Sequence, residues 1–103
     1  VNELVLVLTT EVNRAVAEAL AKQLLQRRLA ACVSLRDIRS YYCWKGDLHE
    51  DDEVQLSIKT TQKKLENLLD LIDKLHTYEV PELLYWNVSV SNAYGTWTEG
   101  TVS

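Results

Sequence analysis

The sequence predicts an α+β domain in which a four-stranded antiparallel sheet carries two helices on one face. Three observations lead to this fold class. Segments with strand and helix patterns follow one another in the order β-α-β-β-α-β. The 103 residues are the size of one domain, and 47% of them are hydrophobic, which is enough to form a core. Only 3 Gly and 1 Pro are present, so residues 1–103 should form a single domain built mostly of regular elements.

The chain begins with a strand followed by a helix. Five consecutive apolar residues, Leu4 to Leu8, are typical of a strand that is covered on both faces. Thr9 and Thr10 offer hydroxyl groups that can cap a helix, and Glu11 would suit the helix dipole in the first turn. We therefore expect a helix over residues 11–29. Its apolar positions recur at helical spacing, at Val12, Val16, Ala19, Leu20 and Leu24.

A long hairpin follows the first helix. Residues 32–44 are rich in β-forming side chains, with a possible break at 36–37, and residues 45–47 read as a tight turn. The returning segment, residues 54–59, alternates apolar and polar residues with the period of a strand. We expect the acidic run of residues 50–53 to lie at the hairpin tip.

The second half of the chain repeats the helix and strand pattern. Thr60–Thr61 precede an amphipathic helix, and Pro81 cannot extend that helix. The fourth strand is expected at 83–90, and Tyr94 and Trp97 lie on a C-terminal turn or short helix. The whole order is that of the split β-α-β, or ferredoxin-like, arrangement. The apolar residues of the second helix are Leu65, Leu68, Leu69, Ile72 and Leu75.

The second face of such a sheet has no helix to cover it. The first strand is nevertheless apolar at five consecutive positions, and residues 83–86 are also apolar in a row. Because no further segment is available in the chain, we expect another subunit to cover this face.

Composition restricts the partners. The net charge is −4 and the pI is about 5.1, which argues against nucleic acid as a partner. The longest apolar runs hold about five residues, far below the ~20 that span a membrane. Cys32 and Cys43 form no C-x-x-C pair, so we expect two free thiols in a reducing cytoplasm.

No catalytic motif is visible. The sequence has no G-x-S-x-G elbow, no G-x-x-x-x-G-K-[ST] phosphate loop and no G-x-G-x-x-G motif. We therefore expect a binding protein and not an enzyme.

Two segments combine residue types that bind ligands. Residues 40–46 hold three aromatic side chains, which either pack across the strands or form a ligand-stacking wall or a subunit contact. In residues 76–82, His76 either caps the second helix or acts as a metal ligand or proton carrier. His49 beside the acidic run could bind a divalent ion, although such runs are more often solvated.

Five motifs, in their order and spacing, resemble those of the CutA family of divalent-cation tolerance proteins, and together they extend over almost the whole chain. They are Leu29–Val33, Ser40–Gly46, Ile58–Thr61, residues 76–82 with His76, Tyr78, Val80, Pro81 and Glu82, and Asn92 with Tyr94 and Trp97.

The resemblance implies a ferredoxin-like subunit in a tight trimer, similar in architecture to the PII signalling proteins. It implies tolerance of copper and other divalent metals, no required cofactor, and a metal ion (copper or zinc) or a small ligand bound at clefts between subunits. The alternative is a signalling or scaffold trimer in which metal binding is incidental. The matching residues are Trp44, Lys59, Tyr78 and Glu82 for the cleft and His76 for the metal.

Two departures from the family pattern concern metal binding. Copper-binding members add a Cys near the start of the first helix and a second His beside the shared one. This chain has no Cys between Val1 and Ala31, and Leu75 precedes His76. The residue after the shared His, usually Pro, is Thr77. We therefore expect weak divalent-ion binding that depends partly on His76.

Overall fold

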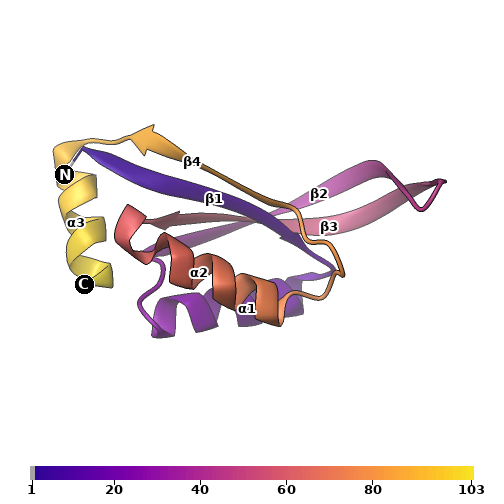
Figure 1. Ribbon diagram of the computed structural model, residues 1–103, viewed down its shortest axis with the longest axis horizontal. Helices are drawn as coiled ribbons and strands as arrows, with labels where there is room; N and C mark the ends of the chain where they lie inside the picture. The colour runs from indigo at the N-terminus through magenta and orange to yellow at the C-terminus, as the bar shows by residue number, and fades with distance from the viewer. Residues whose placement is uncertain (1) are drawn as a thin grey trace.

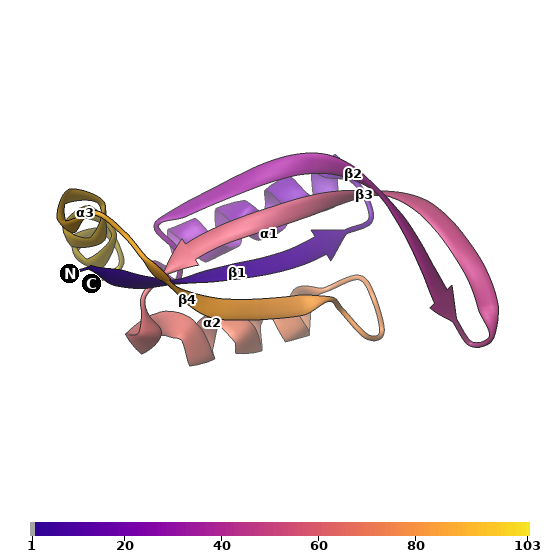
Figure 2. The ribbon, with the colours of Figure 1, turned by 90° about the horizontal axis from the view of Figure 1, so that it is seen from above.

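Four strands and three helices make up the computed structural model, which describes residues 2–103. The strands form one antiparallel sheet in the order β2-β3-β1-β4, and α1 and α2 lie together on one of its faces (Figures 1 and 2). The predicted α+β class and element order are confirmed. The elements are β1 (Glu3–Glu11), α1 (Arg14–Gln26), β2 (Cys32–Trp44), β3 (Asp47–Thr60), α2 (Gln62–Leu75), β4 (Leu83–Ser89) and α3 (Asn92–Val102).

The core lies between the sheet and the helix pair α1 and α2. Alternate residues of the two central strands point into it, because successive side chains of a strand face opposite sides of the sheet. Val5 and Val7 of β1 are paired in register with Thr60 and Ile58 of β3, and all four are almost fully buried. The helices contribute Ala17, Leu20, Ala21, Leu24, Leu65, Leu68, Leu71 and Ile72.

The first helix is shorter than predicted. β1 continues through Glu11, because its pairing with β3 extends to Glu11 opposite Val54. The N-cap of α1 is Asn13, whose side-chain oxygen accepts a hydrogen bond from the N–H of Val16 at 2.9 Å. The threonines therefore do not cap the helix, and Glu11 is not in its first turn. Val12 and Ala19, predicted for the core, are exposed.

The β2–β3 hairpin is longer and more regular than predicted. β2 runs without the break expected at 36–37, since the ladder pairs every residue from Cys32 to Trp44 with β3. The turn is Lys45–Gly46, with positive φ at both positions (51° and 85°), as a two-residue hairpin turn requires. The acidic residues 50–53 lie within β3 and not at the tip. Two of them, Glu50 and Asp52, form cross-strand ion pairs with Arg39.

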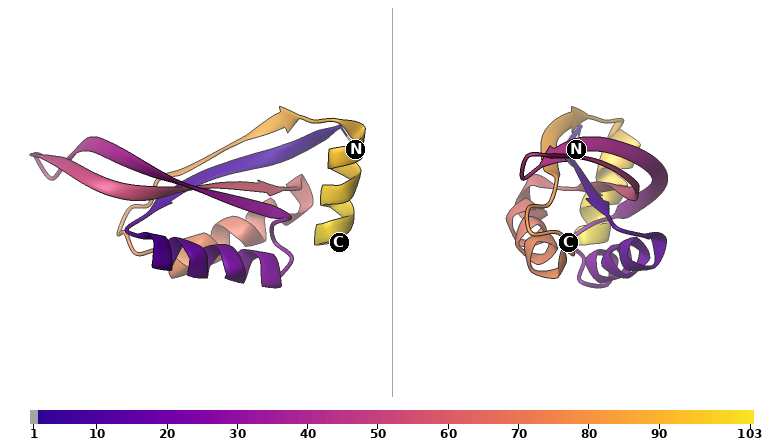
Figure 3. Two further views of the ribbon diagram at one scale, coloured as in Figure 1. Left: turned by 180° about the vertical axis from the view of Figure 1, so that it is seen from behind. Right: turned by 90° about the vertical axis from the view of Figure 1, so that its right-hand side faces the viewer.

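The outer half of this hairpin extends beyond the helices (Figures 1 and 3). The molecule measures 45 × 24 × 21 Å along its principal axes, and its radius of gyration is 14.3 Å. A compact chain of this length would have a radius of gyration of about 13 Å. The projecting hairpin therefore makes the subunit elongated.

The second face of the sheet is apolar along β1 and β4 and largely uncovered. Leu84 and Trp86 of β4 are 51% and 45% exposed, opposite Leu8 and Leu6 of β1. Helix α3 packs at the end of the sheet where the N-terminus lies (Figure 1). This helix confirms the prediction of a C-terminal turn or short helix at Tyr94 and Trp97. Its N-cap, Ser91, accepts a hydrogen bond from the N–H of Tyr94. The uncovered face agrees with the apolar surface that the sequence predicts.

Both cysteines are free thiols, as predicted. Cys32 begins β2 and Cys43 is its penultimate residue, so the two lie near opposite ends of the β2–β3 ladder. Within residues 2–103, no helix combines the length and the apolar character needed to cross a membrane.

Candidate functional site

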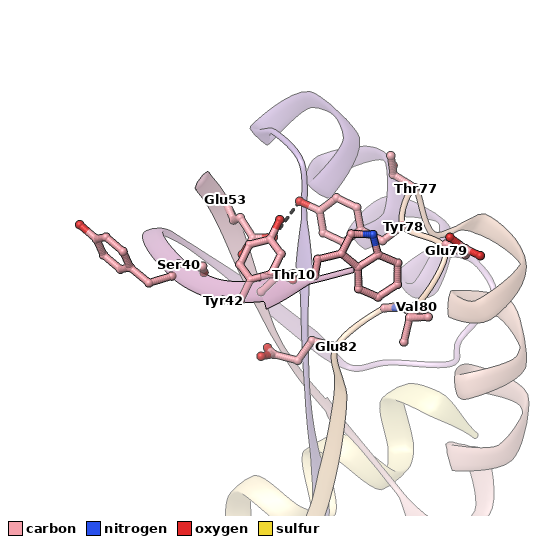
Figure 4. Close-up of a pocket in the computed structure, with 12 residues that line it drawn as sticks. Thr10, Ser40, Tyr42, Glu53, Thr77, Tyr78, Glu79, Val80 and Glu82 are labelled. Carbon is pink, nitrogen blue, oxygen red and sulfur yellow. Dashed lines mark hydrogen bonds between the residues drawn. The ribbon is translucent and has the colours of Figure 1, made fainter. Parts of the chain in front are cut away.

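A cavity of about 670 Å³ opens between the outer half of the hairpin and the loop of residues 76–82, which joins α2 to β4 (Figure 4). Pockets of this size hold small organic molecules. Its walls combine aromatic rings with three carboxyl groups. The lining residues are Thr10, Ser40, Tyr41, Tyr42, Trp44, Glu53, Thr77, Tyr78, Glu79, Val80, Pro81 and Glu82.

The loop is held against β1 by a buried glutamate. The side chain of Glu11 is fully buried, and Oε1 accepts a hydrogen bond from the N–H of Val12 at 3.1 Å. Oε2 accepts one from the N–H of Thr77, also at 3.1 Å. A proline at position 77 would have no N–H to donate. The departure from the family pattern at this position therefore provides a loop donor that Glu11 binds.

His76 closes the end of α2 and is bonded through both ring nitrogens. The backbone N–H of His76 donates to the carbonyl of Ile72 at 2.9 Å, which fits the interpretation of His76 as the C-cap of α2. Nδ1 accepts from the N–H of Tyr78 at 3.1 Å, so the network assigns the ring proton to Nε2, which lies 3.1 Å from Thr9 Oγ1. Nδ1 is also 3.7 Å from Glu11 Oε2, and the imidazole is fully buried.

This arrangement does not fit a preformed metal centre. A metal ion on His76 would need a ring nitrogen that is already bonded inside the chain. No group of three or more His, Cys, Asp or Glu side chains suited to a metal ion occurs among residues 2–103. The role of His76 as a metal ligand stays a prediction, and the geometry supports its part in positioning the loop.

Tyr78 joins the loop to the hairpin. Its hydroxyl donates to Glu53 Oε2 at 2.7 Å (Figure 4), and its ring lies 5.2 Å from the His76 ring. Burial, followed by the hydrogen bond to Glu53, raises the pKa of Tyr78 well above its ordinary value. The phenol therefore stays neutral and acts as a donor at physiological pH.

The wall that the hairpin forms is aromatic, and contacts between its two strands hold the rings in place. The Tyr42 ring stacks on His49 across the ladder, with centroids 5.3 Å apart, and its hydroxyl donates to Asp51, which raises the pKa of Tyr42. The ammonium group of Lys45 lies 5.6 Å from the centre of the Trp44 ring. The rings thus pack across the strands, as one interpretation predicts, and the same segment lines the cavity. Its use as a ligand-stacking wall stays a prediction. His49 takes part in stacking.

Three of the predicted cleft residues lie together. Trp44 comes from the hairpin, and Tyr78 and Glu82 come from the loop. Lys59 does not join them within one subunit, since its Nζ donates to Ser34 Oγ at 3.0 Å further along β3. Its place at a cleft between subunits stays a prediction.

Sequence reasoning missed the carboxyl groups that organise the site from the strands. The sequence pattern places Glu53 in a solvated acidic run, but the residue is only 8% exposed. The same pattern places Glu11 in a helix, whereas it lies in β1. The alternation Val5, Val7, Thr9, Glu11 was the available signal, because it continues the strand period past the apolar run.

Fold and site together define an α+β protein in which the hairpin and the 76–82 loop enclose a pocket lined by aromatic rings and carboxyl groups. The sequence model of the CutA1 divalent ion tolerance protein family matches residues 5–101. The chain therefore belongs to the CutA1 divalent ion tolerance protein family.

Individual relatives agree with this assignment. The chain is 38% identical over 95 residues to the divalent-cation tolerance protein CutA of Pyrococcus horikoshii, covering 91% of this chain and 93% of the relative. It is 40% identical over 100 residues to CutA of Pectobacterium atrosepticum, covering 95% and 91%. The structure of CutA from Synechococcus elongatus superposes with a TM-score of 0.95 at 36% identity, covering 100% of this chain and 93% of that one.

Proposed function

We propose that this chain acts in divalent-cation tolerance as a homotrimer of ferredoxin-like subunits. Each subunit binds a divalent metal ion or a small ligand in the pocket between the hairpin and the 76–82 loop, at a cleft between subunits. The observation that carries the proposal is the pocket itself, in which Trp44, Tyr78 and Glu82 converge. The assembly would function in the cytoplasm, where its two free thiols would stay reduced.

The uncovered sheet face supports self-association. Leu84 and Trp86 are about half exposed on an edge strand, and large exposed apolar patches mark interaction surfaces. β4 also leaves one edge of hydrogen-bonding groups unpaired within the subunit, and such edges readily pair with another chain. The trimeric state itself is taken from the family resemblance.

A second candidate function is a PII-like signalling or scaffold trimer in which metal binding is incidental. The geometry around His76 favours it, because both ring nitrogens already have partners inside the subunit. In this case the pocket would take a metabolite, and divalent ions would bind weakly or elsewhere.

Two measurements test the proposal. Light scattering at micromolar concentration should give a mass of about 35 kDa, three times the 11.8 kDa of one chain. A monodisperse mass near 11.8 kDa would overturn the trimer.

Isothermal titration with copper or zinc should then be compared between wild type, His76→Ala and Glu82→Gln. Reduced binding in both variants supports a metal ion in or beside the pocket. Identical binding in wild type and His76→Ala removes His76 from the metal site and favours the second candidate.

A further inference from the structure

We propose that the pocket selects a small organic ammonium cation. This inference rests on the proposed function in one respect, namely that this pocket is the ligand site. It adds the chemical class of the ligand. Three features of the walls carry it: their excess of carboxyl groups, the buried state of one of them, and their aromatic rings.

The charge of the lining is negative. Glu53, Glu79 and Glu82 line the cavity, and none of its lining residues is a lysine, arginine or histidine. Glu79 pairs at 3.9 Å with Lys45 at the exposed rim. Within one subunit, Glu53 and Glu82 have no cationic partner within 4 Å among the described residues. The Lys59 that the family resemblance places at this cleft would come from a neighbouring subunit and would offset one of the three carboxylates, which leaves the lining negative. An anionic ligand would be repelled by this lining, and a cation would be attracted.

The burial of Glu53 independently indicates a cationic ligand. The residue is only 8% exposed, and its Oε2 accepts the hydrogen bond from Tyr78. A buried carboxylate is costly unless it is paired with a positive charge. In Figure 4 Glu53 comes from the hairpin wall and Glu82 from the loop wall. A cation in the cavity would supply the partner that the subunit lacks.

The aromatic rings distinguish an organic cation from a metal ion. Trp44, Tyr42 and Tyr78 line the cavity, and ring faces attract ammonium groups within about 6 Å. The chain already shows this chemistry at the rim, where the ammonium of Lys45 lies 5.6 Å from the Trp44 ring centre and 3.9 Å from a Glu79 oxygen. A volume of about 670 Å³ also suits an organic molecule and far exceeds the space that one ion needs.

The test uses the side-chain analogue of lysine. n-Butylammonium chloride is titrated at matched ionic strength into the assembled protein, and the indole N–H signals of its three tryptophans are followed by NMR. 1-Butanol is the neutral probe of similar shape. Tetramethylammonium is the third probe, because it keeps the positive charge but cannot donate a hydrogen bond, and it therefore reports binding by charge and aromatic rings without hydrogen bonds.

We expect saturable shifts of the Trp44 indole with both ammonium probes, smaller shifts of Trp86 and Trp97, and none with 1-butanol. Glu53→Gln and Glu82→Gln should weaken butylammonium binding about threefold to tenfold, the loss typical of one cation contact. Glu50→Gln is the matched control, since it removes the same charge from the same strand outside the pocket lining. It should leave binding unchanged.

Absence of saturable ammonium binding, or equal weakening by Glu50→Gln, overturns the inference, and so does equal binding of 1-butanol. Titration of the same samples with copper or zinc distinguishes this failure from a failure of the proposed function. Metal binding that Glu82→Gln weakens would leave the pocket as the ligand site and reject only the organic cation. Loss of both kinds of binding would reject the pocket as well.

Discussion

Replacing Glu11 by alanine should destabilise the fold by releasing the loop that forms one wall of the pocket. The carboxyl group is fully buried and accepts hydrogen bonds from the backbone of Val12 and Thr77. Hydrogen bonds that involve a charged group contribute about 1.5–3 kcal/mol each. Val12 and Thr77 are exposed residues, so water can partly replace the lost acceptor. Each bond should therefore contribute an amount at the lower end of this range. The expected loss is about 3 kcal/mol in the free energy of unfolding.

The assay is equilibrium unfolding in urea at one fixed protein concentration, because the stability of an oligomer depends on concentration. Glu11→Gln keeps one acceptor oxygen and should lose less than Glu11→Ala. Glu3→Ala is the matched control, since Glu3 lies exposed on the same strand, and its effect should be within about 0.5 kcal/mol. A Glu11→Ala protein as stable as the control would refute the reasoning and show that the loop is held by other contacts.

Three further predictions concern the site, the assembly and the thiols. The raised pKa of Tyr78 means that the folded state holds the phenol proton more tightly than the unfolded state. The resulting contribution to stability is constant below about pH 10 and is lost as the pH rises above it. Tyr78→Phe should therefore flatten the decline in the free energy of unfolding between about pH 9 and 11. Trp86→Asp places a charge on the uncovered sheet face and should shift the light-scattering mass towards 11.8 kDa; an unchanged trimer mass would exclude Trp86 from the interface. Mass spectrometry without reduction should find Cys32 and Cys43 both alkylated after unfolding, and a cross-linked peptide of the two would contradict this.

The sequence was sufficient for the element order because apolar periodicity is local. It was less reliable where an element ends, as at Thr9 and Thr10. Threonine is both a good helix cap and a good strand former, so its preference leaves the choice open. These residues adopt the strand conformation because they pair with β3, Thr9 opposite Leu56 and Glu11 opposite Val54. That pairing joins residues more than forty positions apart, and no local pattern encodes it.

The site was predicted only in part for the same reason. Trp44, Tyr78 and Glu82 were predicted from the resemblance to a family. The pattern of a family reflects residues that the shared fold brings together, so it includes contacts between distant segments. The sequence pattern assigns Glu53 to a solvated run, because the three residues before it are acidic. Its burial arises only when the twisted hairpin brings it under Tyr78. Contacts between a strand and a distant loop depend on twist and register, which a single sequence leaves undetermined.

The projecting hairpin has a consequence for local dynamics. Residues 39–50 of β2 and β3 are mostly exposed and lie beyond the helices, so within one subunit their amides are protected by a two-stranded ladder alone. Such ladders are marginally stable, and their amides should exchange with deuterium through local opening far below the free energy of global unfolding. Slow exchange in this segment would then have to come from a neighbouring chain or from a bound molecule. Deuterium uptake by Tyr41, Tyr42 and Trp44 would therefore report, residue by residue, when the wall of the pocket becomes rigid.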